Sequence, residues 1–383
     1  MVLKDPEPLG FDYLPDVLVG RDDKFAELAS IFSTIDRPET CCNAVITGPV
    51  GSGKTAMALR FTKDVMRELW SKREILHVHV NCRNNKTTTQ ILHKIVTKLE
   101  PRHPNRGLSS SEVLNSVRTI LRNADQHLVV ILDEVNHVLQ QEGNNLLYHL
   151  LRIDEDKSGR GTLSLILISQ ENVLHRLEGA VISRLGHSNH IRLQAYDTAG
   201  LLEIARQRAG LALFEESYDE AVLELIAQAA EHGGDARNVL HLIEGAAKSA
   251  EKSGRRQIEP KDIQRTAAIE APPIEPHVVD ELNPHAQMVL LAICRRLRKS
   301  PQVTSGDVER LYHVICEEYD QQSKSHTTLW KYLKALERGE LIVSRTGTMP
   351  SGRGRTQHFT MPSLLPADMA KRLEGKLTRR FLP

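Results

Sequence analysis

A glycine-rich segment constrains the fold of this chain more than any other feature. Residues Gly48–Thr55 read Gly-x-x-x-x-Gly-Lys-Thr, directly after an apolar run (Ala44–Thr47) and directly before a helix-like stretch (Ala56–Trp70). The glycines allow positive-φ backbone, so consecutive N–H groups can converge on phosphate oxygens, and the following helix offers its positive end to the same anion. The order of strand, loop and helix predicts a nucleoside triphosphate site rather than a glycine-rich turn that matches by accident.

The loop also predicts individual contacts. Lys54 is expected between the β- and γ-phosphates, and the Thr55 hydroxyl is expected to ligate Mg²⁺. All eight residues of the loop are predicted to contact the nucleotide, namely Gly48, Pro49, Val50, Gly51, Ser52, Gly53, Lys54 and Thr55.

A pair of acidic residues supplies the second half of such a site. A continuous apolar run (His127–Leu132) ends in Asp133 and Glu134, and buried parallel strands carry ligands at their carboxyl ends. Asp133 is predicted to hold Mg²⁺, and Glu134 is predicted to polarise the attacking water. A solvated strand end would also explain the pair, but its place after a phosphate loop favours hydrolysis.

The order of apolar runs predicts the domains. Strand-like runs near 44–48, 75–81, 127–133, 162–169 and 190–193 alternate with helical segments, which predicts an α/β fold with a parallel sheet. Only helical patterns follow, and then a Pro-rich connector. We therefore expect an α/β core over 1–196, a helical lid over 197–270, a linker over 271–283 and a last domain over 284–383.

Charge and pattern suggest what the last domain does. From Leu282 onward there are 17 Lys or Arg against 9 Asp or Glu, whereas the preceding residues carry 33 against 40. Helical patterns near 285–299, 304–320 and 325–339 are followed by two strand-like runs, which predicts a winged helix that binds DNA. The tip between the two strands is expected to contain Gly347, Gly352, Arg353, Gly354 and Arg355. The expected DNA contacts are Lys324, His326, Thr327, Thr328, Lys331, Lys334, Arg345, Arg353 and Arg355. A basic face that docks protein is the alternative.

Composition sets the compartment. No apolar run approaches the roughly 20 residues that cross a bilayer, so no membrane partner is expected. Five cysteines form no Cys-x-x-Cys pair, which favours a reducing, cytoplasmic setting. The DNA binding expected of the last domain adds association with the nucleoid. His77, His79 and Cys82 lie near one strand and are interpreted as ordinary sheet residues, with a metal cluster as the alternative.

Taken together, these motifs resemble the AAA+ ATPases that recognise replication origins in archaea, relatives of the eukaryotic origin-recognition and helicase-loading subunits. The resemblance covers nearly the whole chain, and its most specific part is Gly234-Asp235-Ala236-Arg237. It implies that Arg237 reaches the nucleotide phosphates from the lid, and that Arg184 faces a neighbouring protomer's γ-phosphate. Val19 would line the adenine pocket, and the segment 84–111 would correspond to an insertion that touches DNA.

Some positions depart from the pattern of that family. Gln170 stands where an asparagine usually acts as the first sensor of the nucleotide, and Asn136 stands where an aspartate is common. Gly179 and Ala180 replace a Pro-Arg pair before Arg184. Gln170 is still predicted to orient the attacking water.

The resemblance implies an initiator that binds origin DNA and helps to load the replicative helicase. ATP and ADP would switch it, hydrolysis would be slow, and other initiator protomers would join it on the DNA. Two alternatives stay open: an AAA+ helper ATPase of DNA transposition, and a signalling switch ATPase whose winged helix binds no DNA.

Overall fold

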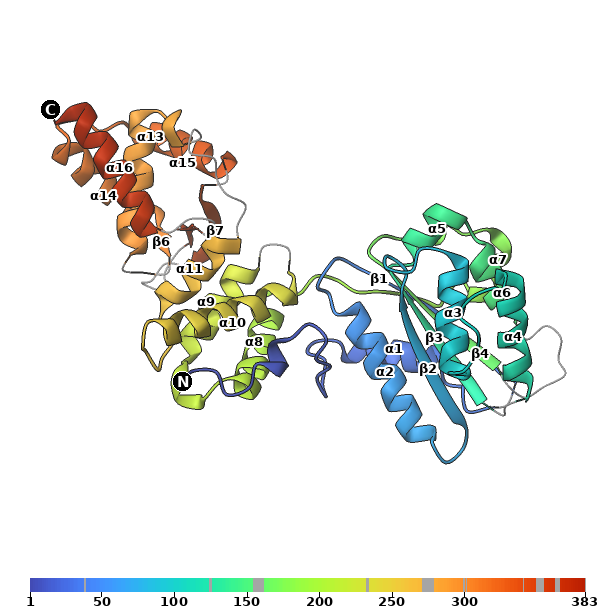
Figure 1. Ribbon diagram of the computed structural model, residues 1–383. Helices are drawn as coiled ribbons and strands as arrows, with labels where there is room; N and C mark the ends of the chain where they lie inside the picture. The colour runs from blue at the N-terminus through green and yellow to red at the C-terminus, as the bar shows by residue number, and fades with distance from the viewer. Residues whose placement is uncertain are drawn as a thin grey trace. The chain divides into compact units, whose positions relative to one another are not determined.

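The structure is a computed structural model of the chain. It describes residues 1–37, 39–123, 126–153, 162–231, 234–270, 279–298, 300, 302–339, 341–348, 355–361 and 366–382. The chain forms two compact units. We call them the sheet unit (Gly10–Ile204 with Ala230–Asn238) and the helical unit (Met1–Leu9, Ala205–Ala229 and Val239–Pro383), and describe each by itself (Figure 1).

The sheet unit is built on five parallel strands. They are β1 (Asn43–Thr47), β2 (Glu74–Asn81), β3 (Gln126–Asp133), β4 (Thr162–Ser169) and β5 (His190–Arg192), and their order is β2-β3-β4-β1-β5. Strands β3 and β4 lie inside the sheet and are buried along almost their whole length, as continuous apolar runs predict. The predicted strand positions agree with the observed ones to within a residue or so.

Helices cover both faces of this sheet (Figure 1). One face packs against α1 (Asp22–Ile31) and α2 (Lys54–Leu69). The other face packs against α3 (Thr88–Leu99), α4 (Ser110–Asn123), α5 (Asn136–Glu142), α6 (Asn145–Leu150) and α7 (Gly179–Leu185). Successive side chains of β3 point to opposite faces of the sheet. Val129 and Ile131 pack in the core with α1 and α2, and Val130 packs in the core on the other face.

A buried polar network ties β3 to β4 near their first residues. His127 is fully buried, and its ring nitrogens lie 2.6 Å from Thr162 Oγ1 and 2.9 Å from Ser164 Oγ. Arg73 also donates to the Thr162 hydroxyl. Burial, and to a smaller extent the charge of Arg73, lowers the pKa of His127 to about 3, so this ring is neutral near pH 7.

The helices predicted as a lid are α8 (Thr198–Ala212), α9 (Glu220–Ala230), α10 (Ala236–Lys252) and α11 (Pro260–Glu270). Within the helical unit, the first residues of the chain pack on these helices. Leu3 forms an antiparallel bridge with Leu213, and the Glu251 carboxylate accepts the N–H groups of Val2 and Leu3 at 2.7 and 3.2 Å. The segment before Gly10 thus belongs structurally to the lid helices rather than to the α/β fold.

The remainder of the helical unit is a winged helix. Its elements are α13 (Pro284–Leu297), β6 (Val303–Thr304), α14 (Ser305–Glu318), α15 (His326–Arg338), β7 (Val343–Thr348), β8 (Arg355–Thr360) and α16 (Pro366–Phe381). The antiparallel sheet has the order β6-β8-β7. Buried residues of α13, α14, α15 and α16 share one core.

Two expectations for this domain need correction. The hairpin strands are longer than predicted, so Gly347 lies within β7 and Arg355 begins β8, where it pairs with Thr348. Both residues therefore lie on paired strands instead of at the tip. The tip itself, with Gly352, Arg353 and Gly354, lies outside the described residues, as does the Pro-rich connector over 271–278. Strand β6 and helix α16 were not predicted from the sequence.

Candidate functional site

The carboxyl ends of three neighbouring strands bring the predicted catalytic segments together. The phosphate loop follows β1, the acidic pair ends β3, and Gln170 follows β4, which lies between the other two. Open parallel sheets bind ligands at this edge. A small cavity of about 80 Å³ lies there, lined by Val50, Gly51, Lys54, Thr55, Asn81, Asp133, Glu134, Ser169, Gln170 and Arg237.

The phosphate loop has the backbone that an anion cradle needs. Gly51 and Gly53 have φ values of 69° and 88°, in the left-handed region, and Lys54 begins α2. The Lys54 ammonium is buried and donates to the carbonyls of Gly48 and Pro49 at 2.8 and 2.6 Å. Burial lowers the pKa of Lys54, and the nearby Asp133 carboxylate opposes that shift. This ammonium is therefore held within the loop by weak acceptors that a phosphate can replace.

The start of α10 rests on the same loop. A Cβ atom at Gly51 would lie 1.7 Å from Asp235 Oδ1, so only glycine fits there. Ala236 N donates to the Gly51 carbonyl at 3.3 Å, and Asp235 caps the helix by accepting from Arg237 N at 2.8 Å. Arg237 lines the cavity from this helix end. Arg237 thus lies beside the loop, and its contact with nucleotide phosphates stays a prediction.

Three donors fix the Asp133 carboxylate. Oδ2 accepts from Thr55 Oγ1 at 2.6 Å and lies 3.3 Å from His79 Nε2, while Oδ1 accepts from Glu134 N at 2.9 Å. Burial by itself would raise the pKa of Asp133, but the hydrogen bonds from His79 and Thr55 outweigh it and hold that pKa below its usual value. Asp133 is therefore an ionised carboxylate beside a hydroxyl.

Glu134 combines two features that are unusual for an ordinary strand end. Its φ is 53°, a left-handed conformation that costs energy in any residue with a Cβ. Its Oε2 atom is buried and, within the described part of the chain, has no hydrogen-bond partner. The Ser169 hydroxyl in the same cavity is also buried and unpartnered among the described residues, so these oxygens point to a polar ligand.

These groups fit a nucleotide with Mg²⁺. A hydroxyl and an ionised carboxylate in contact are the oxygen ligands that Mg²⁺ prefers, and they adjoin a loop whose N–H groups can surround phosphates. The orphaned Glu134 oxygen lies in the same cavity, where a water molecule could serve as its partner.

Arg21 binds the phosphate loop through the carbonyl of Ser52. Its guanidinium is buried and donates to the carbonyls of Ser52 at 3.1 Å and Gln194 at 2.8 Å, and it lies 3.9 Å from the centre of the Tyr196 ring. Val19 lies two residues earlier and is not among the described residues that line the cavity. Its role at an adenine ring stays a prediction.

Arg184 is exposed on α7 and does not line this cavity. Its guanidinium donates to the Leu151 carbonyl at 3.3 Å. An arginine that serves a neighbouring protomer must reach the surface, and Arg184 does, but its action in a second protomer stays a prediction.

The predicted recognition helix, α15, has one buried and one exposed face. Leu329, Leu333 and Leu336 are buried in the core of the winged helix. Thr327, Lys331 and Lys334 are exposed, and their spacing of four and three residues places them along a single face. Such a face can meet DNA phosphates and base edges.

Other predicted DNA contacts are placed differently. Both ring nitrogens of His326 are engaged within the domain, at 3.0 Å from Glu309 Oε1 and 2.8 Å from Trp330 Nε1. The Thr328 hydroxyl lies 3.1 Å from Ser325 Oγ, which reduces its freedom to contact a ligand. Lys324 is exposed before α15, Arg345 lies on β7 and Arg355 is exposed on β8.

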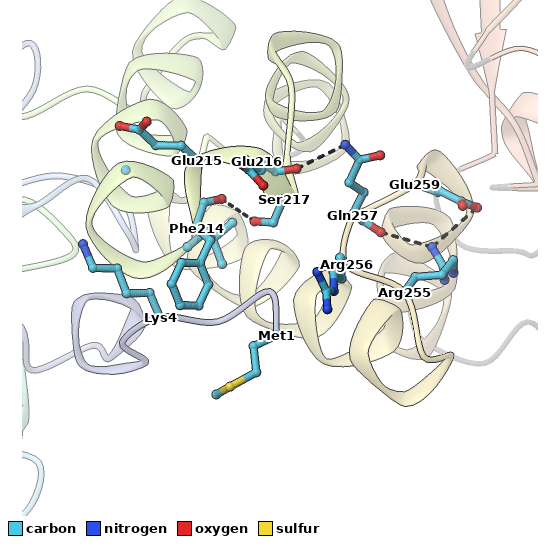
Figure 2. A pocket seen from close by; sticks show the side chains of 12 residues that line it. Met1, Lys4, Phe214, Glu215, Glu216, Ser217, Arg255, Arg256, Gln257 and Glu259 are labelled. Atoms are coloured by element: carbon cyan, nitrogen blue, oxygen red, sulfur yellow. Dashed lines mark hydrogen bonds and ion pairs between the residues drawn. The ribbon is translucent and has the colours of Figure 1, made fainter.

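A second hollow, of about 970 Å³, lies in the helical unit (Figure 2). It is larger than the cavity at the phosphate loop, and two of its charged residues, Arg255 and Glu259, pair with each other. Arg255 lies 3.4 Å from Glu259 and also pairs with Asp262, and Gln257 donates to the Glu216 carbonyl at 3.1 Å. We place the chemistry in the smaller cavity, because the glycine-rich loop and the acidic pair meet there.

Three residues in or beside the cavity were missed by the sequence analysis as parts of this site. Asn81 and Ser169 are the last residues of β2 and β4, so their position at strand ends could have marked them. His79, which contacts Asp133, lies inside a strand and carries no such signal.

Models of three known families match successive parts of the chain. An AAA domain matches residues 37–177, a Cdc6 AAA+ ATPase-type lid domain matches 202–268, and the CDC6 C-terminal winged helix domain matches 277–364. With the sheet order and the phosphate loop, these matches define an AAA+ ATPase that carries a lid and a winged helix.

Full-length similarity gives the group within that class. The chain is 26% identical over 400 residues to ORC1-type DNA replication protein 2 of Saccharolobus solfataricus, covering 100% of this chain and 94% of that protein. It is 29% identical over 353 residues to ORC1-type DNA replication protein 1 of Sulfolobus acidocaldarius, covering 91% and 87%. The chain is therefore similar along its whole length to the Cdc6/ORC1 AAA+ ATPases, whose lid and winged-helix models both match it.

Solved structures agree in fold. The crystal structure of Cdc6p from Pyrobaculum aerophilum superposes with a TM-score of 0.84 at 24% identity, over 100% of both chains. The ORC1 protein of Aeropyrum pernix, in complex with DNA, gives a TM-score of 0.65 at 24% identity, over 100% of this chain and 98% of that one. In the part of the chain that the structure describes, no helix has the length and apolar character to cross a membrane.

Proposed function

We propose that this chain is a DNA replication initiator that binds origin DNA, uses ATP and ADP as a switch and helps to load the replicative helicase. The observation that carries the proposal is the occurrence, in one chain, of the Lys54–Asp133–Glu134 cavity and a winged helix with a basic exposed face on α15. The full-length relatives are named as ORC1-type DNA replication proteins, which supports this function over transposition or signalling.

The residues of the cavity suggest how ATP is held. We infer that the loop N–H groups and Lys54 bind the phosphates, and that Arg237 adds a second cation from α10. Thr55 Oγ1 and Asp133 would hold Mg²⁺, which when bound neutralises charge on the β- and γ-phosphate oxygens. Val19 would contact the base.

Hydrolysis would then depend on Glu134 and Gln170. Glu134 Oε2 would accept a proton from water as the water oxygen bonds to the γ-phosphorus and the bond to the β–γ bridging oxygen breaks. Gln170 is exposed at the mouth of the cavity and would orient that water through its amide. Arg184 of a neighbouring protomer would stabilise the charge that develops. Turnover would be slow, as suits a switch.

DNA binding would use the winged helix and a second region. The exposed residues Thr327, Lys331 and Lys334 would lie in the major groove, with Lys324, Arg345, Arg353 and Arg355 on the backbone beside it. The hairpin of α3 and α4, which contains most of the segment 84–111, would add contacts. The solved structure of the ORC1 protein from Aeropyrum pernix is a complex with DNA, which supports DNA as the partner.

Footprinting of the purified protein across its own genome, with ATP and with ADP, tests the proposal. We expect protection at a few discrete sites, with a pattern that differs between the two nucleotides. Uniform weak protection that is the same with both nucleotides would contradict origin recognition and the switch.

A further inference from the structure

A row of polar residues on β2 leads to the nucleotide cavity. His77, His79 and Asn81 alternate along the strand, so their side chains lie on one face of the sheet. Strand β2 pairs in parallel with β3, with Asn81 opposite Asp133 and His79 opposite Ile131. The ring of His79 reaches diagonally, and its Nε2 lies 3.3 Å from Asp133 Oδ2.

The chemistry of this contact fixes the direction of the hydrogen bond. An ionised carboxylate has only acceptors, so Nε2 of His79 carries the proton and donates it. Oδ2 of Asp133 then receives two donors, from His79 and from Thr55 Oγ1, while Oδ1 receives Glu134 N. The donors come from three different segments of the chain, so together they restrict the rotation of the Asp133 carboxylate.

We propose that His79 is a positioning residue that orients the Asp133 carboxylate for the divalent cation of the nucleotide. The inference rests on the proposed binding of ATP with Mg²⁺. A hydrogen bond from a neighbouring residue orients a metal ligand before the metal binds, so the ligand loses less conformational entropy on binding. Loss of such a hydrogen bond therefore weakens the affinity for the metal. Nothing in the strand pattern alone distinguishes His79 from His77, so the contact with Asp133 carries the assignment.

A role in stability alone would look different. The side chain of His79 is 31% exposed and lies on an edge strand of the sheet, so its removal creates no buried cavity. His77 lies on the same strand and face, and its Nδ1 contacts Met66 Sδ at 3.2 Å. It provides a matched control, because its loss affects the same strand without removing a donor to Asp133.

The experiment measures Mn²⁺ binding by the full chain in the presence of saturating ADP, from the electron paramagnetic resonance signal of free Mn²⁺. We expect His79→Leu to weaken Mn²⁺ binding by about tenfold, with ADP affinity in EDTA unchanged. His79→Gln should recover most of the affinity, because its amide Nε2 can donate from nearly the same place. His77→Leu should behave as the parent.

Parental Mn²⁺ affinity in His79→Leu would overturn the inference while leaving the proposed function intact. An equal loss in His77→Leu would overturn it too, because the effect would then belong to the strand. If the parent itself shows no metal-dependent nucleotide binding, the proposed function fails, and the inference fails with it. Recovery of Mn²⁺ affinity in His79→Gln would show that the hydrogen bond to Asp133, and not the volume of the side chain, supports metal binding.

Discussion

Glu134 holds an unfavourable backbone conformation at the edge of the cavity beside the phosphate loop. Its left-handed backbone and its buried, unpartnered Oε2 atom cost free energy of the order of a few kcal/mol. Such strain is concentrated at functional sites. The adjacent Asp133, in contrast, is satisfied by three donors, so the two carboxylates of the pair are prepared for different tasks.

Glu134→Gln should leave ATP affinity within about twofold of the parent and slow single-turnover hydrolysis by at least about 100-fold, because an amide cannot accept the proton of water. Binding of a fluorescent ATP analogue and release of phosphate measure the two quantities. Hydrolysis at the parental rate would show that another group is the general base.

Lys54→Ala should weaken ATP binding by at least about tenfold, since the buried ammonium is the principal cation within the loop. The measurement is isothermal titration calorimetry. Lys63→Ala, on the same helix α2, is the control and should bind ATP as the parent does. Equal affinities in all three proteins would remove Lys54 from the phosphate site.

At the scale of elements, strands β3 and β4 depend on a neutral histidine. The depressed pKa of His127 means that the folded state resists protonation while the unfolded state accepts a proton below about pH 6.5. Stability due to this group is therefore complete above pH 6.5 and is lost progressively as the pH falls toward about 3.

Urea unfolding followed by circular dichroism at pH 7.5 and pH 5.5 checks this linkage. The His127 contribution should lower the free energy of unfolding by about 1.4 kcal/mol at the lower pH. The amide of His127→Gln does not titrate, so the free energy of unfolding of this variant should fall between pH 7.5 and pH 5.5 by about 1.4 kcal/mol less than that of the parent. Identical pH dependence in the two proteins would mean that His127 has the same pKa in the folded and unfolded states.

The exposed face of α15 gives the second prediction at this scale. Lys331→Ala should weaken duplex binding for every sequence and reduce the salt slope by about one unit, as expected for a phosphate contact. Lys371→Ala is the control, because Lys371 is exposed on α16 of the same domain. Fluorescence anisotropy at several salt concentrations measures both. An unchanged slope in Lys331→Ala would remove this face from the interface.

The sequence predicted the parallel sheet and the lid helices closely, because long apolar runs and strong breaks determine them. It did not predict β6, which has only two residues and is defined by its pairing with β8. It also offered His326 to DNA, whereas Glu309 and Trp330 bind its ring. The contact of His326 with Glu309, like that of His79 with Asp133, joins residues on different elements of the chain, and periodicity carries no signal for it.

At the scale of the whole molecule, the nucleotide and DNA sites must be linked if the protein is a switch. The affinity for duplex DNA differs by some factor between the ATP-bound and the ADP-bound protein. By thermodynamic linkage, bound duplex must change the ratio of ATP affinity to ADP affinity by the same factor. A factor of 5–150 is typical of such coupling. Anisotropy and nucleotide titration measure the two sides independently.

Arg237→Gln is expected to reduce that factor toward one, because the arginine that lines the nucleotide cavity lies on a helix that continues into the helical unit. Arg256→Gln, exposed in the helical unit, is the control. If coupling persists at full strength in Arg237→Gln, communication between the sites follows another route.

The close approach of Asp235 to Gly51 restricts how this protein can evolve. A side chain at position 51 would need the backbone at position 235 to move, because its Cβ would lie 2.7 Å from Asp235 Cα, and it would also have to adopt left-handed geometry, so shortening Asp235 alone would not make room for it. Lineages that descend from this protein should keep this glycine even after ATP turnover has decayed, provided that α10 still begins against the loop.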